Sequence, residues 1–223
     1  MNWIWSNTDL IWDRTLDHLV LTLPAIVLSF VIAVPVGVLA NRFRPSRGAI
    51  LSTVGMLYAI PSLPLFIVLP IIVGTSARSP LNLIIALTLY GVALMVRVVA
   101  DGLESVDRDV RQSATAVGFS AWTQFWQVDL PLSGPVLLAG MRVVAVSTVS
   151  LATVGAVIGV QSLGSLFTDG FQRGIQAEII AGIAATVVLA LALDGALVLL
   201  GRVLMPWTRT MRVRLPAPTA VAA

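Results

Sequence analysis

Residue types that build most catalytic and metal sites are missing or scarce in this sequence. The 223 residues contain no cysteine and a single histidine, His18. Without cysteine there is no disulfide, no thiol catalysis and no site for a soft metal. His18 has no acidic or histidine cluster around it that is consistent with a metal site. We therefore expect no bound metal and a structural or interfacial role for His18.

Charged residues are also scarce. They make up 11% of the sequence, whereas 57% of the residues are hydrophobic, which is far outside the range of soluble globular proteins. The formal net charge of +3 comes from 14 basic residues, all arginine, and 11 acidic ones. Such a small and dispersed charge does not indicate a nucleic-acid partner. The composition predicts an all-α protein embedded in a lipid bilayer.

Five apolar runs are long enough to cross a bilayer as helices. The first, residues 19–40, has no charged side chain and would be about 33 Å long as a helix. Tryptophans in the amphipathic segment before it suit a membrane interface. We expect an external or interfacial segment at residues 1–18, spans at 19–40, 49–74, 81–100, 133–160 and 179–204, and a cytoplasmic tail at 205–223 whose end is disordered.

The second run is interrupted by two prolines in the segment Ile60–Pro64. Two prolines three residues apart should end a helix, because each lacks a backbone donor and its ring clashes with the preceding turn. A discontinuous helix at membrane depth is tolerated where protein covers it or where it lines a cavity. The alternative is a plain kink.

The longest polar segment with a helical pattern is residues 107–131. Its apolar side chains recur every three or four residues, and Gly118 and Ser120 interrupt them. Glycine favours the position after a helix and serine the position before one, so we expect two short helices with a bend between them. Asp107 would cap the first helix and Pro131 would stop the second. The segment suits a partner's groove; the alternative is an amphipathic helix on the bilayer surface.

Arginine placement predicts the orientation of the spans. Cytoplasmic loops carry an excess of arginine, so the richer side is assigned to the cytoplasm. This places the N-terminus outside, and the segment 107–131 and the C-terminus inside. The inner side would hold Arg42, Arg44, Arg47, Arg108, Arg111, Arg209, Arg212 and Arg214, and the outer side Arg14, Arg78 and Arg173.

The segment 107–131 also resembles the "EAA" loop of binding-protein-dependent ABC importer permeases. That pattern is Glu-Ala-Ala, three residues, Gly, nine residues, then Ile-x-Leu-Pro. Gly118 and the pair Leu130 and Pro131 fall at the same spacing, whereas Gln112 and Ser113 depart from Glu and Ala. The resemblance implies contact with an ATPase through Gln112, Ser113, Ala114, Val117, Gly118, Phe119, Val128, Leu130 and Pro131.

The resemblance extends over most of the chain. Residues 58–63 are similar to a Thr-Ile-Pro-Ser-Leu turn of glycine betaine, carnitine and choline permeases. Residues 89–97 and 139–166 are similar to the third span, fourth span and outer loop of the same branch. Methionine importer permeases share the five-span plan. The branch implies an osmoprotectant such as glycine betaine, choline or carnitine, with methionine or another amino acid as the alternative.

The resemblance implies the partners as well. They are a second permease subunit (identical or paralogous), two cytoplasmic ABC ATPases and an external substrate-binding protein, all at the bacterial cytoplasmic membrane. This sequence has no Walker A and no G-x-G-x-x-G pattern. We therefore expect a multi-pass, non-enzymatic subunit with no cofactor of its own, and ATP-Mg on the ATPase. A stand-alone channel or secondary carrier is the alternative from another class.

Two further sets of residues are candidates within the spans. Buried charges are expected at Arg142, Asp194 and Arg97. Arg142 and Asp194 would pair, with Arg97 as a second possible partner. The alternatives are that Asp194 meets water or that Arg142 reaches the headgroups alone. Hydroxyls on the fourth span line the translocation path or else satisfy backbone carbonyls within helices. The path candidates are Ile60, Pro61, Ser62, Leu63, Pro64, Ser147, Thr148, Ser150 and Thr153.

Overall fold

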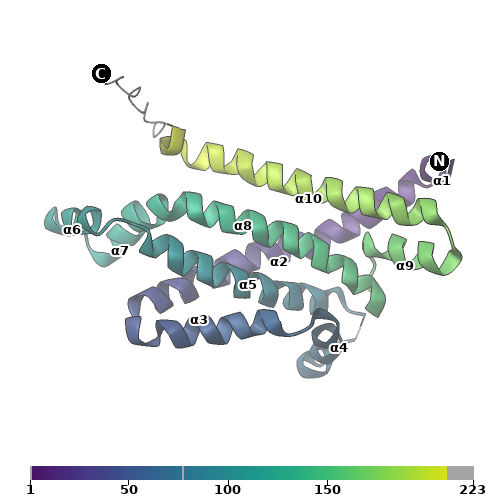
Figure 1. Cartoon of the computed structure of the whole chain (residues 1–223), viewed down its shortest axis with the longest axis horizontal. Coiled ribbons are helices and arrows are strands. Elements are labelled where there is room, and N and C mark those ends of the chain that lie inside the picture. Colours follow the sequence, from purple (N-terminus) through teal and green to yellow (C-terminus); the bar gives the residue numbers. More distant parts are fainter. Residues whose placement is uncertain (1, 77, 210–223) are drawn as a thin grey trace, which may run out of the picture.

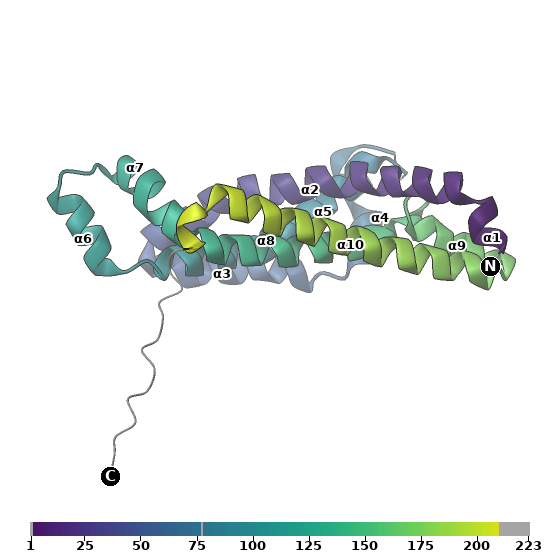
Figure 2. The same cartoon turned by 90° about the horizontal axis from the view of Figure 1, so that it is seen from above.

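The computed structural model describes residues 2–76 and 78–209, and these residues form helices and turns without strands. The predicted disorder at the end of the tail lies outside the described residues. The helices form an elongated bundle (Figures 1 and 2). Helices α6 and α7 and the last turns of α10 lie at one end, here called the loop end. Helices α1 and α9 lie at the other, the far end.

Most of the chain is in long helices joined by short connections. The helices are α1 Asn2–Ser6, α2 Thr8–Arg42, α3 Arg44–Ala59, α4 Ser62–Val73, α5 Pro80–Glu104, α6 Arg108–Ala116, α7 Ala121–Gln124, a π turn Phe125–Asp129, α8 Leu130–Ala152, a 3₁₀ segment Thr153–Ile158, α9 Gly164–Arg173, α10 Gln176–Leu204 and a 3₁₀ turn Pro206–Arg209.

Four helical stretches are long and apolar enough to cross a membrane: Thr8–Arg42, Pro80–Glu104, Ala121–Ile158 and Gln176–Leu204. A fifth candidate is the pair Arg47–Ala59 and Ser62–Val73, whose axes are bent by 102°. If this pair counts as one span, the described residues agree with the five runs predicted from the sequence.

Helix α2 begins at Thr8, eleven residues before the predicted start of the first span. A helix of 35 residues is about 52 Å long, well beyond the roughly 30 Å of a hydrocarbon core. The N-terminal segment is therefore helical from Thr8 onward and continuous with the first span. His18 lies within this continuation and is fully buried.

Helix α5 is the most buried of the long helices. Small residues let its neighbours approach closely: a Cβ on Gly37 of α2 would lie 2.6 Å from Val99, and one on Gly140 of α8 would lie 2.4 Å from Val98. Such contacts are typical of helix packing in membranes, where van der Waals packing replaces the hydrophobic effect between helices. They hold α2, α5 and α8 together as the core of the bundle.

The fourth span departs from the sequence prediction at both ends. Pro131 does not stop the second loop helix, because the chain stays helical from Ala121 to Ile158. A π turn precedes the proline, with the amide of Leu130 bonded to the Phe125 carbonyl, and this wider turn makes room for the ring. Beyond Ala152 the helix tightens to 3₁₀ and ends at Gly159, whose φ is 84°.

Candidate functional site

The two short helices of the segment 107–131 project from the loop end of the bundle (Figures 1 and 2). Asp107 caps α6 by accepting a hydrogen bond from the Asp109 amide at 2.9 Å. Ser120 caps α7 by accepting one from the Thr123 amide at 3.2 Å. Both caps are those expected from the sequence.

The bend between these helices is built on Gly118. Its φ is 90°, a left-handed conformation that L residues with a Cβ rarely adopt. The Phe119 amide bonds to the Ala114 carbonyl and the Gly118 amide to the Thr115 carbonyl, each at 3.0 Å. This is the Schellman arrangement, which satisfies the last carbonyls of α6. The predicted bend is therefore present at the predicted residue.

The tip of the loop exposes apolar side chains. Val117 is 74% exposed and Trp122 72%, and the rings of Trp122 and Trp126 meet edge to face. Exposed apolar surface of this kind commonly marks an interaction site. Of the other residues that the loop motif named, Gln112 and Ser113 are exposed, Ala114 is buried, and Phe119, Val128, Leu130 and Pro131 are half-buried.

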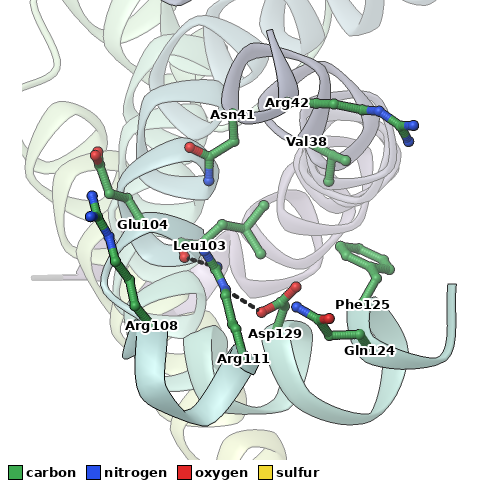
Figure 3. Close-up of a pocket in the computed structure, with 10 residues that line it drawn as sticks. All are labelled: Val38, Asn41, Arg42, Leu103, Glu104, Arg108, Arg111, Gln124, Phe125 and Asp129. Carbon is green, nitrogen blue, oxygen red and sulfur yellow. Dashed lines mark hydrogen bonds and ion pairs between the residues drawn. The ribbon is translucent and has the colours of Figure 1, made fainter. Parts of the chain in front are cut away.

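Arg111 braces the base of the loop (Figure 3). Its Nε donates to Asp129 Oδ1 at 2.7 Å, and its Nη2 donates to the Leu103 carbonyl at the end of α5. These groups border a cavity of about 330 Å³ between the loop and the ends of α2 and α5. This brace could not be predicted from the sequence, because residues 18 positions apart show no helical spacing that would pair them.

The second span is broken rather than kinked. Helix α3 ends at Ala59 and α4 begins at Ser62, so the helix ends where the prolines predicted. Pro64 lies in the first turn of α4, where a missing backbone donor is tolerated. The Ile60 carbonyl at the break accepts a hydrogen bond from Tyr90 Oη at 2.6 Å, and the Tyr58 and Tyr90 rings meet edge to face.

The hydroxyls of the fourth span fall into different environments. Thr148 is buried, Ser147 and Thr153 are half-buried, and Ser150 is exposed. Thr153 Oγ1 donates to the Ser150 carbonyl at 2.7 Å, so this hydroxyl satisfies a backbone group, which was the alternative to lining a path. Near this point Phe66 and Leu69 of α4 share a core cluster with Tyr90 and Ala152. The breaks of the second and fourth spans therefore adjoin.

Arg142 and Asp194 form a two-pronged ion pair between α8 and α10. The Nε to Oδ1 distance is 2.6 Å and the Nη2 to Oδ2 distance is 2.7 Å. Their side chains are 42% and 24% exposed, so the pair is only partly buried in the single chain. Arg97, considered as another partner, lies exposed on α5 outside this pair, and the expectation that it is buried was wrong.

The described part of the chain holds no cluster of three or more His, Cys, Asp or Glu side chains that could bind a metal. Its distinctive features are an exposed, capped loop at one end of the bundle and two broken spans. The model of a protein family described as the binding-protein-dependent transport system inner membrane component matches residues 33–210. This chain belongs to that family. It is the permease subunit of an ABC importer, and a separate ATPase subunit hydrolyses ATP.

Curated relatives resemble the permease over most of its length. A glycine betaine/carnitine/choline transport system permease of Bacillus subtilis (strain 168) is 28% identical, over 92% of this chain and 94% of its own. A carnitine transport permease of Listeria monocytogenes is 31% identical, over 82% and 83%. An osmoprotectant import permease of Salmonella typhimurium is 29% identical, over 92% and 97%. The resemblance drawn from the sequence motifs is thus confirmed.

Solved structures share the permease's fold. An inward-facing structure of the MetNI methionine ABC transporter has a TM-score of 0.76 and 21% identity, and covers 91% of this chain and 98% of the matched chain. An amino acid ABC transporter solved with histidines has a TM-score of 0.72 and 16% identity, over 89% and 96%. At these identities the likeness defines the type I ABC importer fold of the permease and nothing about its substrate.

Proposed function

We propose that this permease carries a quaternary ammonium osmoprotectant such as glycine betaine, choline or carnitine. The observation that carries this proposal is the set of curated relatives, which match 82–92% of the chain and are named for these solutes or for osmoprotectant import. An amino acid such as methionine is the second candidate. It is favoured by the methionine transporter among the solved structures, but that likeness concerns the fold.

Two broken spans support a translocation path beside the core cluster of Tyr90, Phe66 and Ala152. Transporters place substrates where spanning helices are interrupted, since irregular backbone in a membrane is tolerated when it lines a cavity or is covered by protein. The path residues would be Ile60–Pro64 with Ser147, Thr148 and Ser150, and Thr153 would act through its backbone bond. The second wall of the path comes from a second permease subunit, identical or paralogous.

The orientation we propose has the N-terminus outside, the loop end in the cytoplasm and a cytoplasmic C-terminus, by the arginine bias. The tip of the loop then meets one of two ATPases, with Val117 and Phe119 as the apolar contact and α6–α7 as coupling helices. An external binding protein delivers the solute at the far end. ATP and Mg²⁺ belong to the ATPases, and the permease sits in the bacterial inner membrane as a multi-pass subunit.

Coupling follows from these contacts. ATP closes the ATPases and therefore favours the permease state whose loops fit the closed form. The Arg111 brace fixes the loop base to α5 and α8, so movement of the tip reaches the spans that adjoin the breaks. ATP can shift the equilibrium between outward and inward access only by the difference between its binding free energies in the two permease states.

The test is solute uptake into proteoliposomes that hold the permease with the ATPase and binding protein that copurify with it. We expect ATP-dependent uptake of glycine betaine, choline or carnitine and none of methionine. Uptake of methionine alone would move the permease to the amino-acid branch. Uptake that is independent of ATP would reject the coupling scheme.

The orientation of the permease can be tested by labelling cysteines placed at one exposed serine and one exposed glutamine. Ser105 lies at the loop end and Gln161 at the far end, and both are exposed. In whole cells, a membrane-impermeant thiol reagent should label Gln161→Cys and leave Ser105→Cys unlabelled until the cells are opened. The reverse pattern would invert the topology.

A further inference from the structure

The fourth span changes from α-helix to 3₁₀ after Ala152, inside the bundle. In a regular α-helix the Thr153 amide would donate to the Val149 carbonyl. Here it bonds to the carbonyls of Ser150 and Leu151 instead. The last carbonyls of any α-helix lose their partners in this way. Within a bilayer no water is at hand to replace them, and protein groups must do so.

Side chains contact three carbonyls at this end of the helix, and the Ser150 carbonyl also accepts the Thr153 amide. Thr153 Oγ1 donates to Ser150, and Ser162 Oγ lies 3.5 Å from the Ala152 carbonyl. The Val149 carbonyl lies 3.0 Å from His18 Nε2. Thr153 and Ser162 belong to the fourth span and the connection after it, whereas His18 comes from α2, 131 positions away in sequence. His18 therefore ties the first span to the break in the fourth.

The chemistry of this contact defines the state of His18. A carbonyl oxygen only accepts hydrogen bonds, so Nε2 must carry the proton. His18 is fully buried, and its Nδ1 has no hydrogen-bond partner among the described residues. The ring thus serves as a single donor, aimed at one backbone oxygen. Within the described ranges, no metal-binding cluster of His, Cys, Asp or Glu side chains includes it.

The 3₁₀ segment that follows this contact packs against the elements of the second span's break. It begins with Thr153, and its residues Val154 and Ile158 pack against the cluster that contains Phe66 and Tyr90. Its outer part borders a polar cavity of about 260 Å³ shared with α9. A change in the pitch of this segment would alter the packing at both broken spans at once.

We propose that His18 is a positioning residue for translocation: its Nε2–H holds the fourth span in its broken form and so keeps the path in its transport-competent shape. This inference rests on the proposed path. It predicts that the hydrogen-bond donor, rather than the bulk of the ring, is what transport requires.

Three variants separate donor from bulk. His18→Phe keeps a ring and removes the donor, and we expect maximal uptake to fall about tenfold, as for loss of a bond to a buried backbone group. His18→Gln supplies an amide donor at similar reach and should restore most of the uptake. Thr22→Val is the control, because Thr22 is also buried on α2 but donates within its own helix, to the His18 carbonyl.

Hydrogen exchange of residues 149–159 in the assembled complex measures the clamp directly, whatever the solute. We expect exchange about tenfold faster in His18→Phe, and near wild-type exchange in His18→Gln and Thr22→Val. Three outcomes would overturn the proposal. The first is unchanged exchange in His18→Phe, and the second is an equal loss of uptake in His18→Phe and His18→Gln. The third is uptake that falls only in proportion to the amount of assembled complex. Failure of the wild type to import any quaternary ammonium solute would instead reject the proposed substrate, and the exchange result would still decide the clamp.

Discussion

Arg111 donates to Asp129 at 2.7 Å and so joins the first turn of α6 to the last residue before α8. The side chains are 28% and 16% exposed, which makes this a partly shielded, charge-assisted contact rather than a loose surface pair. The same guanidinium reaches the Leu103 carbonyl, so three elements meet at one side chain. The loop is thereby attached at its base to the end of α5 and to the residue that precedes α8.

Breaking this contact should uncouple the ATPase. In Arg111→Gln and Asp129→Asn we expect solute-stimulated ATP hydrolysis to fall about tenfold, with basal hydrolysis unchanged. The double variant should be little worse than either single one, because a direct pair typically has a coupling energy of about 1–2 kcal/mol. Arg108→Gln, one turn earlier on α6, controls for the loss of positive charge. Strictly additive losses would show that the two residues act separately.

The bend at Gly118 makes a second prediction. Its φ of 90° disfavours any residue with a Cβ by about 1–2 kcal/mol, most of all a β-branched one. An added Cβ would meet no atom within 4 Å, so the cost is conformational and not steric crowding. Gly118→Val should abolish stimulated ATP hydrolysis although the protein inserts normally, whereas Gly118→Asn should keep much of it. Equal stimulated ATP hydrolysis in both variants would mean that the bend does not determine the orientation of the loop tip.

We expect the effects of substituting Arg142 and Asp194 on thermal stability to depend on each other. Removing either partner strands a charge inside the membrane, where an unpaired ion is costly. We expect the thermal midpoint of the purified complex to fall in Arg142→Gln and in Asp194→Asn, and the double variant to lose less than the sum of the two. Arg97→Gln removes an arginine outside the pair and should have a small effect. If the two losses simply add, the pair does not stabilise the fold.

We expect the hydroxyl of Tyr90 to stabilise the break in the second span. Its hydroxyl is the donor to the Ile60 carbonyl at 2.6 Å, and the side chain is 4% exposed. Tyr90→Phe leaves that carbonyl without this donor and should cost about 1–3 kcal/mol of stability, with slower uptake. Tyr58→Phe keeps the ring contact and is the matched control. An active, stable Tyr90→Phe permease would show that the break needs no such support.

Local rules in the sequence predicted much of this permease. The length of the apolar runs predicted the spans, and the prolines of Ile60–Pro64 predicted the helix break. The caps and the bend were predicted from Asp107, Gly118 and Ser120. Each of these features depends on residues close in sequence, whose backbone preferences are strong. The same rules failed at Pro131, because a π turn in the preceding residues removed the clash that normally ends a helix.

Contacts between distant residues could not be predicted in this way. His18 and Val149 are 131 positions apart, and no composition or period links a histidine to one particular carbonyl. In the sequence, Arg111 counted only as one arginine in the prediction of orientation, and Asp129 was only the variable residue before Leu130 in the loop motif. The extra length of α2 was missed because aspartates and tryptophans suggested an interface, although the helix continues through them to Thr8.

The π turn Phe125–Asp129 holds one residue more than an α-helical register requires. A π turn absorbs such a residue as a local widening, and the α-helix on either side of it keeps its phase. Deleting the surplus residue would restore ordinary helix, but it would also remove the room that the wider turn leaves for the ring of Pro131. One additional residue thus lets a proline stand inside a continuous span without turning Trp122 and the loop tip toward another side of the molecule.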